Sequence, residues 1–529
     1  MPKVTLNGKE LEVGPETTII EAGDRLGIHI PRFCYHPHLS IDGNCRMCLV
    51  EIEGVQKLLP ACATYVDHDM VVHTDTDAVK KAVKGVLEFL LVHHPIDCPI
   101  CDQSGECYLQ DYYMQFGLYK SRFPLKNKIH KAKVKDVGGD IVLDAERCVL
   151  CTRCMRFLRE VTGTDELNIF GRGSHSEIDI YQDQLLRNRY TCNLADICPV
   201  GALTSKDFRF QCRVWYLKEG KSICTGCATG CNVFVHHHEG KVWRMMPRFN
   251  EQVNGPWMCD IGRFSYTAAN DGRIEKPRSV EGEKSVVIDW DAAFYTANLK
   301  IGEVKRDFGA GAIAVIASPR SSNEELYLTK KLAFEIIRTP NLAFTPAVVA
   351  DDYSDEILVS KDKTPNSRGA VELRIGPEDG GLDFDGILDA ARQGKVKLLI
   401  VLGCCLGDLD GDEAGRVVSA VEYSINIAPN ESAVSQASSL VLPSASFVER
   451  GGTFTNEAGR VQRFYRIFPP RIRAREDIRI LADLGRRLGA DWDYKNEEAV
   501  FDDMARSEPF FAGLVYRVIG ENGSEAGGK

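Results

Sequence analysis

AERCVLCTRCMRFLRE, residues 145–160, carries three cysteines at intervals of three residues: Cys148, Cys151 and Cys154. A fourth cysteine, Cys198, follows after 43 intervening residues and stands directly before Pro199. A C-x2-C-x2-C triad completed by a Cys-Pro pair is the ligand pattern of bacterial ferredoxins. Iron–sulfur clusters need soft thiolate ligands, usually four of them. These four cysteines therefore predict one [4Fe–4S] cluster in a ferredoxin-like domain.

Only half of a two-cluster ferredoxin is present. In that fold the pattern occurs twice, and the two halves exchange their fourth ligands. Counting back from Cys198, the second triad would fall on residues that are not cysteines: Asn188, Thr191 and Leu194. The corresponding position after the first triad is Leu158. We therefore expect a single cluster here and a buried thiol at Cys192, which lies out of register.

Two further sets of four consist of cysteines alone. The first set is Cys34, Cys45, Cys48 and Cys62, and the last is Cys224, Cys227, Cys231 and Cys259. The first departs from the C-x4-C-x2-C spacing of plant-type ferredoxins, but it follows a predicted hairpin and helix and so suits a [2Fe–2S] cluster. Taken singly, each set would also suit zinc. Beside the other sets, a [4Fe–4S] cluster is favoured for the last one.

The remaining set, second along the chain, contains a histidine: His94, Cys98, Cys101 and Cys107. A lone histidine is more often structural than a ligand, but this one directly precedes three cysteines. An imidazole in place of a thiolate removes one negative charge from the cluster, which by itself raises the reduction potential. The set predicts a [4Fe–4S] cluster. His93 is the alternative ligand, and the short loop of H-x3-C favours His94.

Composition and charge narrow the class of protein. The chain has 529 residues, 44% of them hydrophobic, which suffices for several domains. Its net charge of -10 does not indicate a nucleic-acid partner. Without an apolar run long enough to span a bilayer, a signal peptide or an import leader, we expect a cytoplasmic protein. Its 19 cysteines are then better explained by metal binding than by disulfides.

Residue patterns also predict the main elements. Alternation around Asn7-Gly8 predicts a hairpin, and a helix is expected over 18–26. Apolar residues at helical spacing predict an amphipathic helix over 79–91, with His94 at its end. Buried strands are expected at 312–318 and 397–403, and two overlapping capping boxes follow the first of them.

Other stretches are expected to be structural or solvated. Residues 120–135 carry seven Lys/Arg and no acid, and we expect a solvated linker there. Residues 520–529 are expected to be disordered. The three cysteines left over, Cys212, Cys404 and Cys405, are expected to be structural.

These signals place the chain in a mixed α+β and α/β class with five domains. The expected order is a β-grasp [2Fe–2S] ferredoxin domain (1–78), a helical [4Fe–4S] domain with one histidine and three cysteine ligands (79–118), a [4Fe–4S] ferredoxin-like domain (138–216), a fourth cluster domain (217–275) and an α/β region (276–529). Alternating strands and helices in the last region indicate a parallel sheet.

Six segments resemble a known family. They are RFCYHPHLSIDGNCRMCLVEIEG (32–54), HHPIDCPICDQSGECYLQD (93–111), DAERCVLCTRCMRF (144–157), NLADICPVGALTSKDFRF (193–210), ICTGCATGCN (223–232) and VLPSASFVERGGTFTNEAGRVQRF (441–464). In them the chain closely resembles the large iron–sulfur (G) subunit of bacterial NADH:quinone oxidoreductase, respiratory complex I. The resemblance covers nearly the whole chain.

The resemblance implies an electron relay with no catalytic residue or substrate site of its own, within a proton-translocating enzyme of the respiratory chain. In this family, electrons come from the flavin subunit that oxidises NADH and leave singly for a ferredoxin-like two-cluster subunit nearer the quinone. The implied cofactors are one [2Fe–2S] cluster on the first set and a [4Fe–4S] cluster on each other set. The implied location is the cytoplasmic side of the bacterial inner membrane, among other peripheral-arm subunits, without a membrane span or nucleic acid.

The region from residue 217 onward resembles molybdopterin enzymes, as a cluster domain followed by a reduced α/β domain. Active members usually carry a lysine two residues after the last cluster cysteine, where this chain has Ile261. The region that follows is also short for enclosing the cofactor, so we expect no molybdopterin. The fourth set matches a cluster that lies off the main electron path in bacterial members.

Two other functions fit parts of the pattern. The catalytic chain of an NAD-linked formate dehydrogenase shares the N-terminal architecture. The missing ferredoxin triad, Ile261 and the short C-terminal region argue against it. A zinc-stapled scaffold without a redox role would place zinc on the same cysteines.

Overall fold

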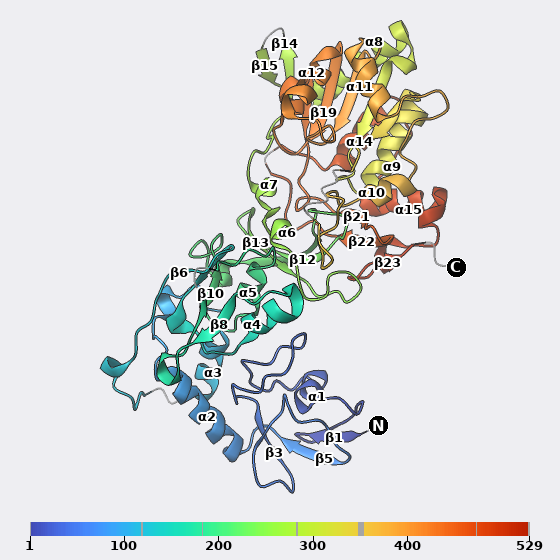
Figure 1. Ribbon diagram of the computed structural model, residues 1–529. Coiled ribbons are helices and arrows are strands. Elements are labelled where there is room, and N and C mark those ends of the chain that lie inside the picture. The colour runs from blue at the N-terminus through green and yellow to red at the C-terminus, as the bar shows by residue number, and fades with distance from the viewer. Residues whose placement is uncertain are drawn as a thin grey trace. The chain divides into compact units, whose positions relative to one another are not determined.

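Figure 1 shows the computed structural model of the chain. It describes residues 2–117, 120–181, 184–281, 284–347, 354–471 and 473–526. The chain forms two compact units, Met1–Leu217 and Lys218–Lys529. The first unit contains the first three ligand sets. The second contains the fourth set and the α/β region.

The first unit begins with a five-stranded sheet in the order β2-β1-β5-β3-β4. Its strands are β1 (Lys3–Leu6), β2 (Lys9–Glu12), β3 (Leu49–Ile52), β4 (Leu59–Pro60) and β5 (Met70–His73). β1 pairs antiparallel with β2 and parallel with β5, which suits the expected ferredoxin-type fold. Asn7 and Gly8 have φ values of 48° and 80°, as a type I′ turn requires, and the predicted hairpin is confirmed.

Helix α1 (Ile19–Arg25) packs on this sheet where a helix was expected. Thr18 caps it, because the Thr18 hydroxyl accepts a hydrogen bond from Glu21 N while the Glu21 carboxylate accepts one from Thr18 N (2.8 Å). Its apolar residues share a core with Val4 and Leu6 of β1. This core supports the loop after α1, which carries most of the first ligand set.

Two helices flank the second ligand set. α2 (Asp77–Leu91) buries three residues along one face, which confirms the predicted amphipathic helix: Val79, Val83 and Leu87. The helix has its C-cap at Val92, so His94 lies in the loop beyond the helix and not at its end as expected. α3 (Tyr108–Phe116) begins directly after Cys107.

The third ligand set lies among short strands and helices. They are β6 (Lys135–Asp136), β7 (Ile141–Leu143), α4 (Arg153–Phe157), β8 (Leu167–Phe170), β9 (Glu177–Ile180), α5 (Cys192–Ile197) and β10 (Leu203–Ser205). β10, β7 and β6 form one antiparallel sheet, and β8 and β9 form a hairpin. α4 continues into a π-helical turn over Leu158–Thr162.

The basic segment 120–135 is mostly exposed, as expected of a solvated linker, and two of its lysines also contact the second ligand loop. Lys128 Nζ donates a hydrogen bond to the carbonyl oxygen of His94 (2.7 Å). Lys133 Nζ lies 2.9 Å from a carboxylate oxygen of Asp97. Both partners belong to the second ligand loop, and the segment therefore supports that loop from outside.

The second unit begins with an antiparallel sheet and two short helices. They are β11 (Lys218–Ile223), β12 (Asn232–His238), β13 (Lys241–Pro247), α6 (Asp260–Phe264) and α7 (Thr267–Asn270). Cys224 directly follows β11, and Cys259 is the N-cap of α6. The fourth ligand set therefore depends on where β11 ends and where α6 begins.

A seven-stranded sheet of order β15-β14-β20-β19-β18-β16-β17 follows. Its strands are β14 (Arg278–Glu281), β15 (Lys284–Val287), β16 (Ile313–Ala317), β17 (Leu342–Phe344), β18 (Leu398–Leu402), β19 (Tyr423–Ala428) and β20 (Leu440–Pro443). The five strands from β20 to β17 are parallel, which confirms the expected α/β region. β16 and β18 coincide with the two predicted buried strands.

Helices cover both faces of this sheet (Figure 1). They are α8 (Trp290–Phe308), α9 (Asn323–Lys331), α11 (Phe384–Arg392), α12 (Gly411–Ala420), α13 (Ala433–Ala437) and α14 (Asp477–Arg487). Two further helices, α10 (Ser367–Glu372) and α15 (Glu497–Ser507), pack against α9. Along β18, Ile400 shares a core with α8, α9 and α14, whereas Leu399 and Val401 share one with α11 and α12. Ser322 and Glu325 form one of the predicted capping boxes, at the start of α9.

Three further strands pair beside the large sheet: β21 (Gly452–Thr455), β22 (Arg460–Phe464) and β23 (Ser524–Glu525). β23 pairs with β22, so the disorder expected for 520–529 was wrong for 520–526. Residues 527–529 lie outside the described residues. Among the residues described, no helix has both the length and the apolar character needed to cross a bilayer.

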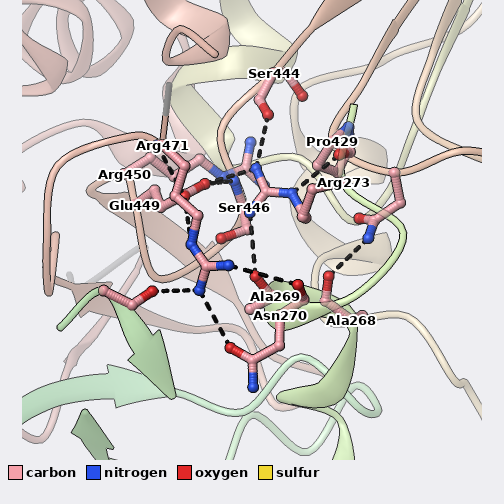
Figure 2. A network of polar contacts seen from close by, with 12 residues as sticks. Ala268, Ala269, Asn270, Arg273, Pro429, Ser444, Ser446, Glu449, Arg450 and Arg471 are labelled. Atoms are coloured by element: carbon pink, nitrogen blue, oxygen red, sulfur yellow. Dashed lines mark hydrogen bonds and ion pairs between the residues drawn. The ribbon is translucent and has the colours of Figure 1, made fainter. Parts of the chain in front are cut away.

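A buried carboxylate joins α7 to the segments that follow the large sheet (Figure 2). Glu449 is fully buried and accepts hydrogen bonds from Arg273 Nη2 (2.7 Å) and from the backbone N–H groups of Ser446 (2.8 Å) and Arg471 (3.1 Å). Arg273 also donates to Ser444 O (3.2 Å). The pair therefore fixes the end of the cluster-bearing segment to the α/β region within the second unit.

We predict that Glu449→Gln destabilises the protein by about 3–5 kcal/mol. The substitution leaves the Arg273 guanidinium buried without its counter-charge. The free energy of unfolding, from denaturant titration, measures the effect. Glu413→Gln is the control, since Glu413 pairs with Arg392 (2.6 Å) at an exposed position and such pairs contribute at most about 1 kcal/mol. Equal losses for the two variants would contradict the role given to Glu449.

Candidate metal centres

The first ligand set brings four thiols into mutual contact. Cys34, Cys45 and Cys48 lie between α1 and β3, and Cys62 follows β4. The thiols of Cys45 and Cys62 donate hydrogen bonds to the Cys34 sulfur and hold its pKa far below the usual value. Hydrogen bonds to Cys34 and Cys48 raise the pKa of Cys62. Thiols that perturb one another's pKa in this way lie close enough together to share a metal centre.

The second ligand set lines a cavity of about 780 Å³. All four expected ligands border it: His94, Cys98, Cys101 and Cys107. Burial raises the pKa of Cys107 to about 12. The Cys107 thiol would therefore be protonated at neutral pH unless a cation stabilised its thiolate.

His94 is better suited than His93 to be the fourth ligand. Burial lowers the pKa of His94 to about 4, so the ring is neutral at physiological pH. Its Nδ1 is buried and has no hydrogen-bond partner among the residues that the structure describes. The corresponding atom of His93 accepts a hydrogen bond from Ile129 N (3.2 Å). An unpartnered, neutral imidazole nitrogen on a residue that borders the same cavity as three cysteines suits metal ligation.

The third ligand set surrounds a small cavity lined by all four cysteines: Cys148, Cys151, Cys154 and Cys198. Burial raises the pKa of Cys148 to about 12 and that of Cys151 to about 11. The chain curls around the cavity because Leu150 and Thr152 take φ values of 52° and 62°. Such a backbone costs about 1–3 kcal/mol at a non-glycine residue and persists where the surroundings enforce it.

The fourth ligand set lines a second small cavity: Cys224, Cys227, Cys231 and Cys259. Burial raises the pKa of Cys259 to about 11. Backbone N–H groups donate to sulfur here, from Gly226 to Cys224 (3.4 Å) and from Gly262 to Cys259 (3.3 Å). A Cβ on Gly262 would lie 2.7 Å from the Cys224 sulfur, so the site needs glycine at this position.

Lys363 also lines the fourth cavity, and sequence reasoning missed it. Arg320 holds the loop that carries Lys363 in place, because it donates to Lys363 O (2.9 Å) and to Thr225 O (2.9 Å), directly after Cys224. Ile261 borders the same cavity. A single lysine in a distant loop has no spacing pattern, so only the fold shows that this residue borders the site.

The third set packs directly against the second. Tyr108 N donates to Pro199 O (3.0 Å), which links the residues that follow Cys107 and Cys198. Arg147 Nη2 lies 2.7 Å from Asp97 Oδ2, which links the residues that precede Cys148 and Cys98. A Cβ on Gly201 would lie only 2.4 Å from the Cys101 sulfur.

The third set also packs against the loop of the first. Asn44 Nδ2, beside Cys45, donates to Leu150 O (3.1 Å), between Cys148 and Cys151. Ser40 N donates to a carboxylate oxygen of Glu160 (2.9 Å). The third set thus contacts both of the other sets in the first unit, although it comes last of the three along the chain.

Four cysteines lie outside the sets. Cys192 is 1% exposed at the start of α5, as expected from its place in the sequence. Cys404 donates a hydrogen bond to Asn430 O (3.5 Å), while Cys405 is exposed and Cys212 is half-buried. All 19 cysteines carry free thiols in the structure.

The donor sets fit iron–sulfur clusters in both chemistry and burial. Each gathers soft ligands, the third and fourth around small cavities, and the unpartnered Nδ1 of His94 is available as a nitrogen donor. Glycines at 201 and 262 leave room next to ligand sulfurs that any side chain would fill.

The sequence models of five protein families match the chain. They are described as a 2Fe-2S iron-sulfur cluster binding domain (residues 2–77), an NADH-ubiquinone oxidoreductase-G iron-sulfur binding region (84–122), an NADH-quinone oxidoreductase subunit 3 ferredoxin-like domain (138–204), an NDSU1/NuoG-like 4Fe-4S domain (217–267) and molybdopterin oxidoreductase (387–487). The chain therefore contains domains that bind 2Fe-2S and 4Fe-4S clusters, together with a molybdopterin-oxidoreductase domain.

Relatives match along nearly the whole chain. The G subunit of NADH-quinone oxidoreductase from Rickettsia bellii is 30% identical over 97% of this chain and 90% of its own length. The same subunit of Rickettsia typhi is 31% identical over 97% and 91%. The 75 kDa subunit of NADH-ubiquinone oxidoreductase from Reclinomonas americana is 43% identical over 56% of this chain and 42% of its own.

The matched domains define an iron–sulfur electron-transfer protein. More particularly, the chain belongs to the family of the NADH-quinone oxidoreductase G subunit, a component of respiratory complex I. The resemblance inferred from the sequence is thereby confirmed, as is its function as an electron-transfer subunit of an oxidoreductase complex.

We predict that Gly201→Ala disrupts the second site, because the added methyl group would overlap the Cys101 sulfur, which the neighbouring ligands hold in place. Iron analysis of the purified chain should show a loss of about four irons, as for one [4Fe–4S] cluster. Gly85→Ala is the control, since a Cβ at Gly85 in α2 would meet no atom within 4 Å. Full iron content in Gly201→Ala would contradict this geometry.

Proposed function

We propose that each ligand set holds one cluster, which when bound accepts and donates single electrons. The [2Fe–2S] cluster is assigned to Cys34, Cys45, Cys48 and Cys62. One [4Fe–4S] cluster is assigned to each of three sets: His94, Cys98, Cys101 and Cys107; Cys148, Cys151, Cys154 and Cys198; Cys224, Cys227, Cys231 and Cys259. The convergence of each set on one site supports this assignment.

We infer that electrons pass from the first set to the third and then to the second. The support is the packing of the third set's backbone against both others, through Asn44 and Leu150 on one side and Tyr108 and Pro199 on the other. The order along the chain therefore differs from the order proposed for transfer. The fourth set lies in the other compact unit, and we place it off this path.

The residues of the chain hold the cluster ligands in place, limit the access of water to them and donate hydrogen bonds to their sulfur atoms. Thr152 and Leu150 aim the third-set cysteines inward by their left-handed backbone. Backbone N–H groups, such as that of Gly262, donate to ligand sulfur and so favour added negative charge. No group of the chain is required to transfer a proton in this role.

We propose two direct partners, a flavin-bearing subunit that oxidises NADH and a ferredoxin-like two-cluster subunit nearer the quinone. Other peripheral-arm subunits of complex I complete the assembly, on the cytoplasmic side of a bacterial inner membrane. The support is the subunit's membership of a complex that joins NADH to quinone.

We also propose that the molybdopterin-oxidoreductase domain of this chain holds no molybdopterin. In open parallel sheets, ligands bind at the carboxyl ends of the strands where the strand order reverses, here between β16 and β18. At this edge the segments that follow the two strands approach each other closely. A Cβ on Gly403, which follows β18, would lie 3.1 Å from the side chain of Ser318, which follows β16. Arg450 donates to Arg320 O (3.2 Å) nearby and pairs with Asp477 (3.2 Å).

The anaerobically purified chain should contain about 14 irons, since a [2Fe–2S] cluster has two and each [4Fe–4S] cluster four. Cys198→Ala should remove one [4Fe–4S] signal from the electron paramagnetic resonance spectrum and leave the others. Cys192→Ala is the matched control, because Cys192 lies in α5 of the same segment but outside the set. Zinc in place of iron, or an unchanged Cys198→Ala spectrum, would refute the assignment.

His94→Ala should abolish the second-site signal, whereas His93→Ala should retain it, because His93 Nδ1 is engaged by Ile129 N. His94→Cys should keep a cluster whose midpoint potential is lower than in the unmodified chain, since a thiolate adds one negative charge. Redox titration followed by electron paramagnetic resonance measures all three. Loss of the signal in His93→Ala alone would identify His93 as the ligand.

A further inference from the structure

Helix α4 carries two buried arginines beside the third ligand set. Arg153 and Arg156 flank Cys154 and are 5% and 8% exposed. Within the described ranges, neither guanidinium pairs with a carboxylate, and their hydrogen bonds go to carbonyl and hydroxyl oxygens. Burying two cations three residues apart on one helix costs free energy unless negative charge lies close by. The structure must therefore supply that charge from another source.

Arg156 joins a ligand of the first set to a ligand of the third. Its Nη2 donates to Cys34 O and to Cys151 O (3.3 Å). Its Nη1 donates to Ser40 O in the first-set loop, and its Nε donates to Thr152 Oγ1 (3.2 Å). One planar group therefore spans the backbones of both sets.

Arg153 makes a second connection between the same two sets. Its Nη2 donates to Tyr35 O (2.6 Å), the residue directly after Cys34. Its Nη1 donates to Ile197 O (3.0 Å), the residue directly before Cys198. The two arginines thus cross the same boundary at separate points, and each has one end at either set.

The ligand residues of both sets lie beside these cations. Arg156 donates to the carbonyl oxygens of two ligand residues, Cys34 and Cys151. Arg153 donates to the residues that directly follow Cys34 and directly precede Cys198. Thiolate ligands at these positions would place negative charge next to both guanidinium groups.

We propose that Arg153 and Arg156 form a cationic bridge that raises the reduction potential at the first and third sites together and couples the two sites. The inference rests on the proposed cluster assignment and identifies positioning residues within it. Added negative charge at either site is stabilised by the same fixed cations. Hydrogen bonds from Arg156 to Cys34 O and Cys151 O also provide a continuous route between the two ligand backbones.

The electron balance of this step is simple. One electron leaves the first site, which is oxidised, and enters the third site, which is reduced. No proton accompanies it, because a guanidinium stays protonated throughout the accessible pH range. A lysine could not replace this geometry, since its ammonium is a point charge without the planar fork that contacts several carbonyls at once.

The test is a redox titration of the assembled complex carrying Arg156→Gln, followed by electron paramagnetic resonance. We expect the reduction equilibria at the first and third sites each to shift about tenfold toward the oxidised form, which is about 59 mV for a one-electron couple. The second and fourth sites should keep their potentials. Arg159→Gln is the control, because exposed Arg159 pairs with Asp165 (2.6 Å) and does not contact either set.

Arg156→Lys separates charge from geometry. It keeps the cation, so both potentials should remain close to those of the unmodified complex. It loses the planar fork, so electron transfer from the first site to the third should slow several-fold in freeze-quench measurements. Unchanged potentials in Arg156→Gln, with all four signals present, would overturn the bridge.

Two further results are decisive. If the Arg156→Gln complex loses the first or third signal, the same titration is carried out on Arg153→Gln. A midpoint potential that shifts at only one of the two sites, or at neither, then overturns the proposal. An unmodified complex that lacks the first or third signal contradicts the cluster assignment itself. Failure of the bridge and failure of the proposed function are therefore distinguished within one set of titrations.

Discussion

The removal of thiolate charge from water is the constraint on which this structure depends. The third and fourth ligand sets are so well buried that the pKa of Cys148 rises to about 12 and that of Cys259 to about 11. Thiolates in such sites are stable only beside cations, and iron supplies most of that charge. The fold therefore has to assemble its ligand loops around metal.

Contacts between distant segments complete each site. Lys128 and Lys133 approach the second loop from the basic segment, and Lys363 approaches the fourth cavity from a loop of the α/β region. Arg153 and Arg156 cross from the third set to the first. Cationic side chains thus recur beside the ligand sets, and those of Arg153 and Arg156 are buried. This arrangement suits a protein whose function is to stabilise added electrons at fixed positions.

Local patterns in the sequence predicted much of this fold. The hairpin at Asn7-Gly8, the amphipathic helix α2 and the buried strands β16 and β18 follow from turn chemistry and periodicity, because each depends on residues near in sequence. The ligand candidates followed from cysteine spacing, and the structure brings each set of four together. Lys363 and Arg156 could not be found in this way, because their partners are set by the tertiary fold. The disorder expected at the C-terminus was wrong for the same reason, since β23 pairs with β22, which lies far away in sequence. The contact of Lys133 with Asp97 could not be predicted either, although the basic segment is mostly exposed as expected.

The central claim is that the third set, although last of the three in sequence, carries iron at the junction of the other two. Anomalous X-ray diffraction at the iron edge from crystals of the anaerobically prepared protein tests this directly. The account predicts iron peaks within all four sets, with the peak among Cys148, Cys151, Cys154 and Cys198 nearer to each of the first two peaks than those are to one another. Peaks that appear at the zinc edge instead, or a first and second peak that adjoin without the third between them, would contradict it.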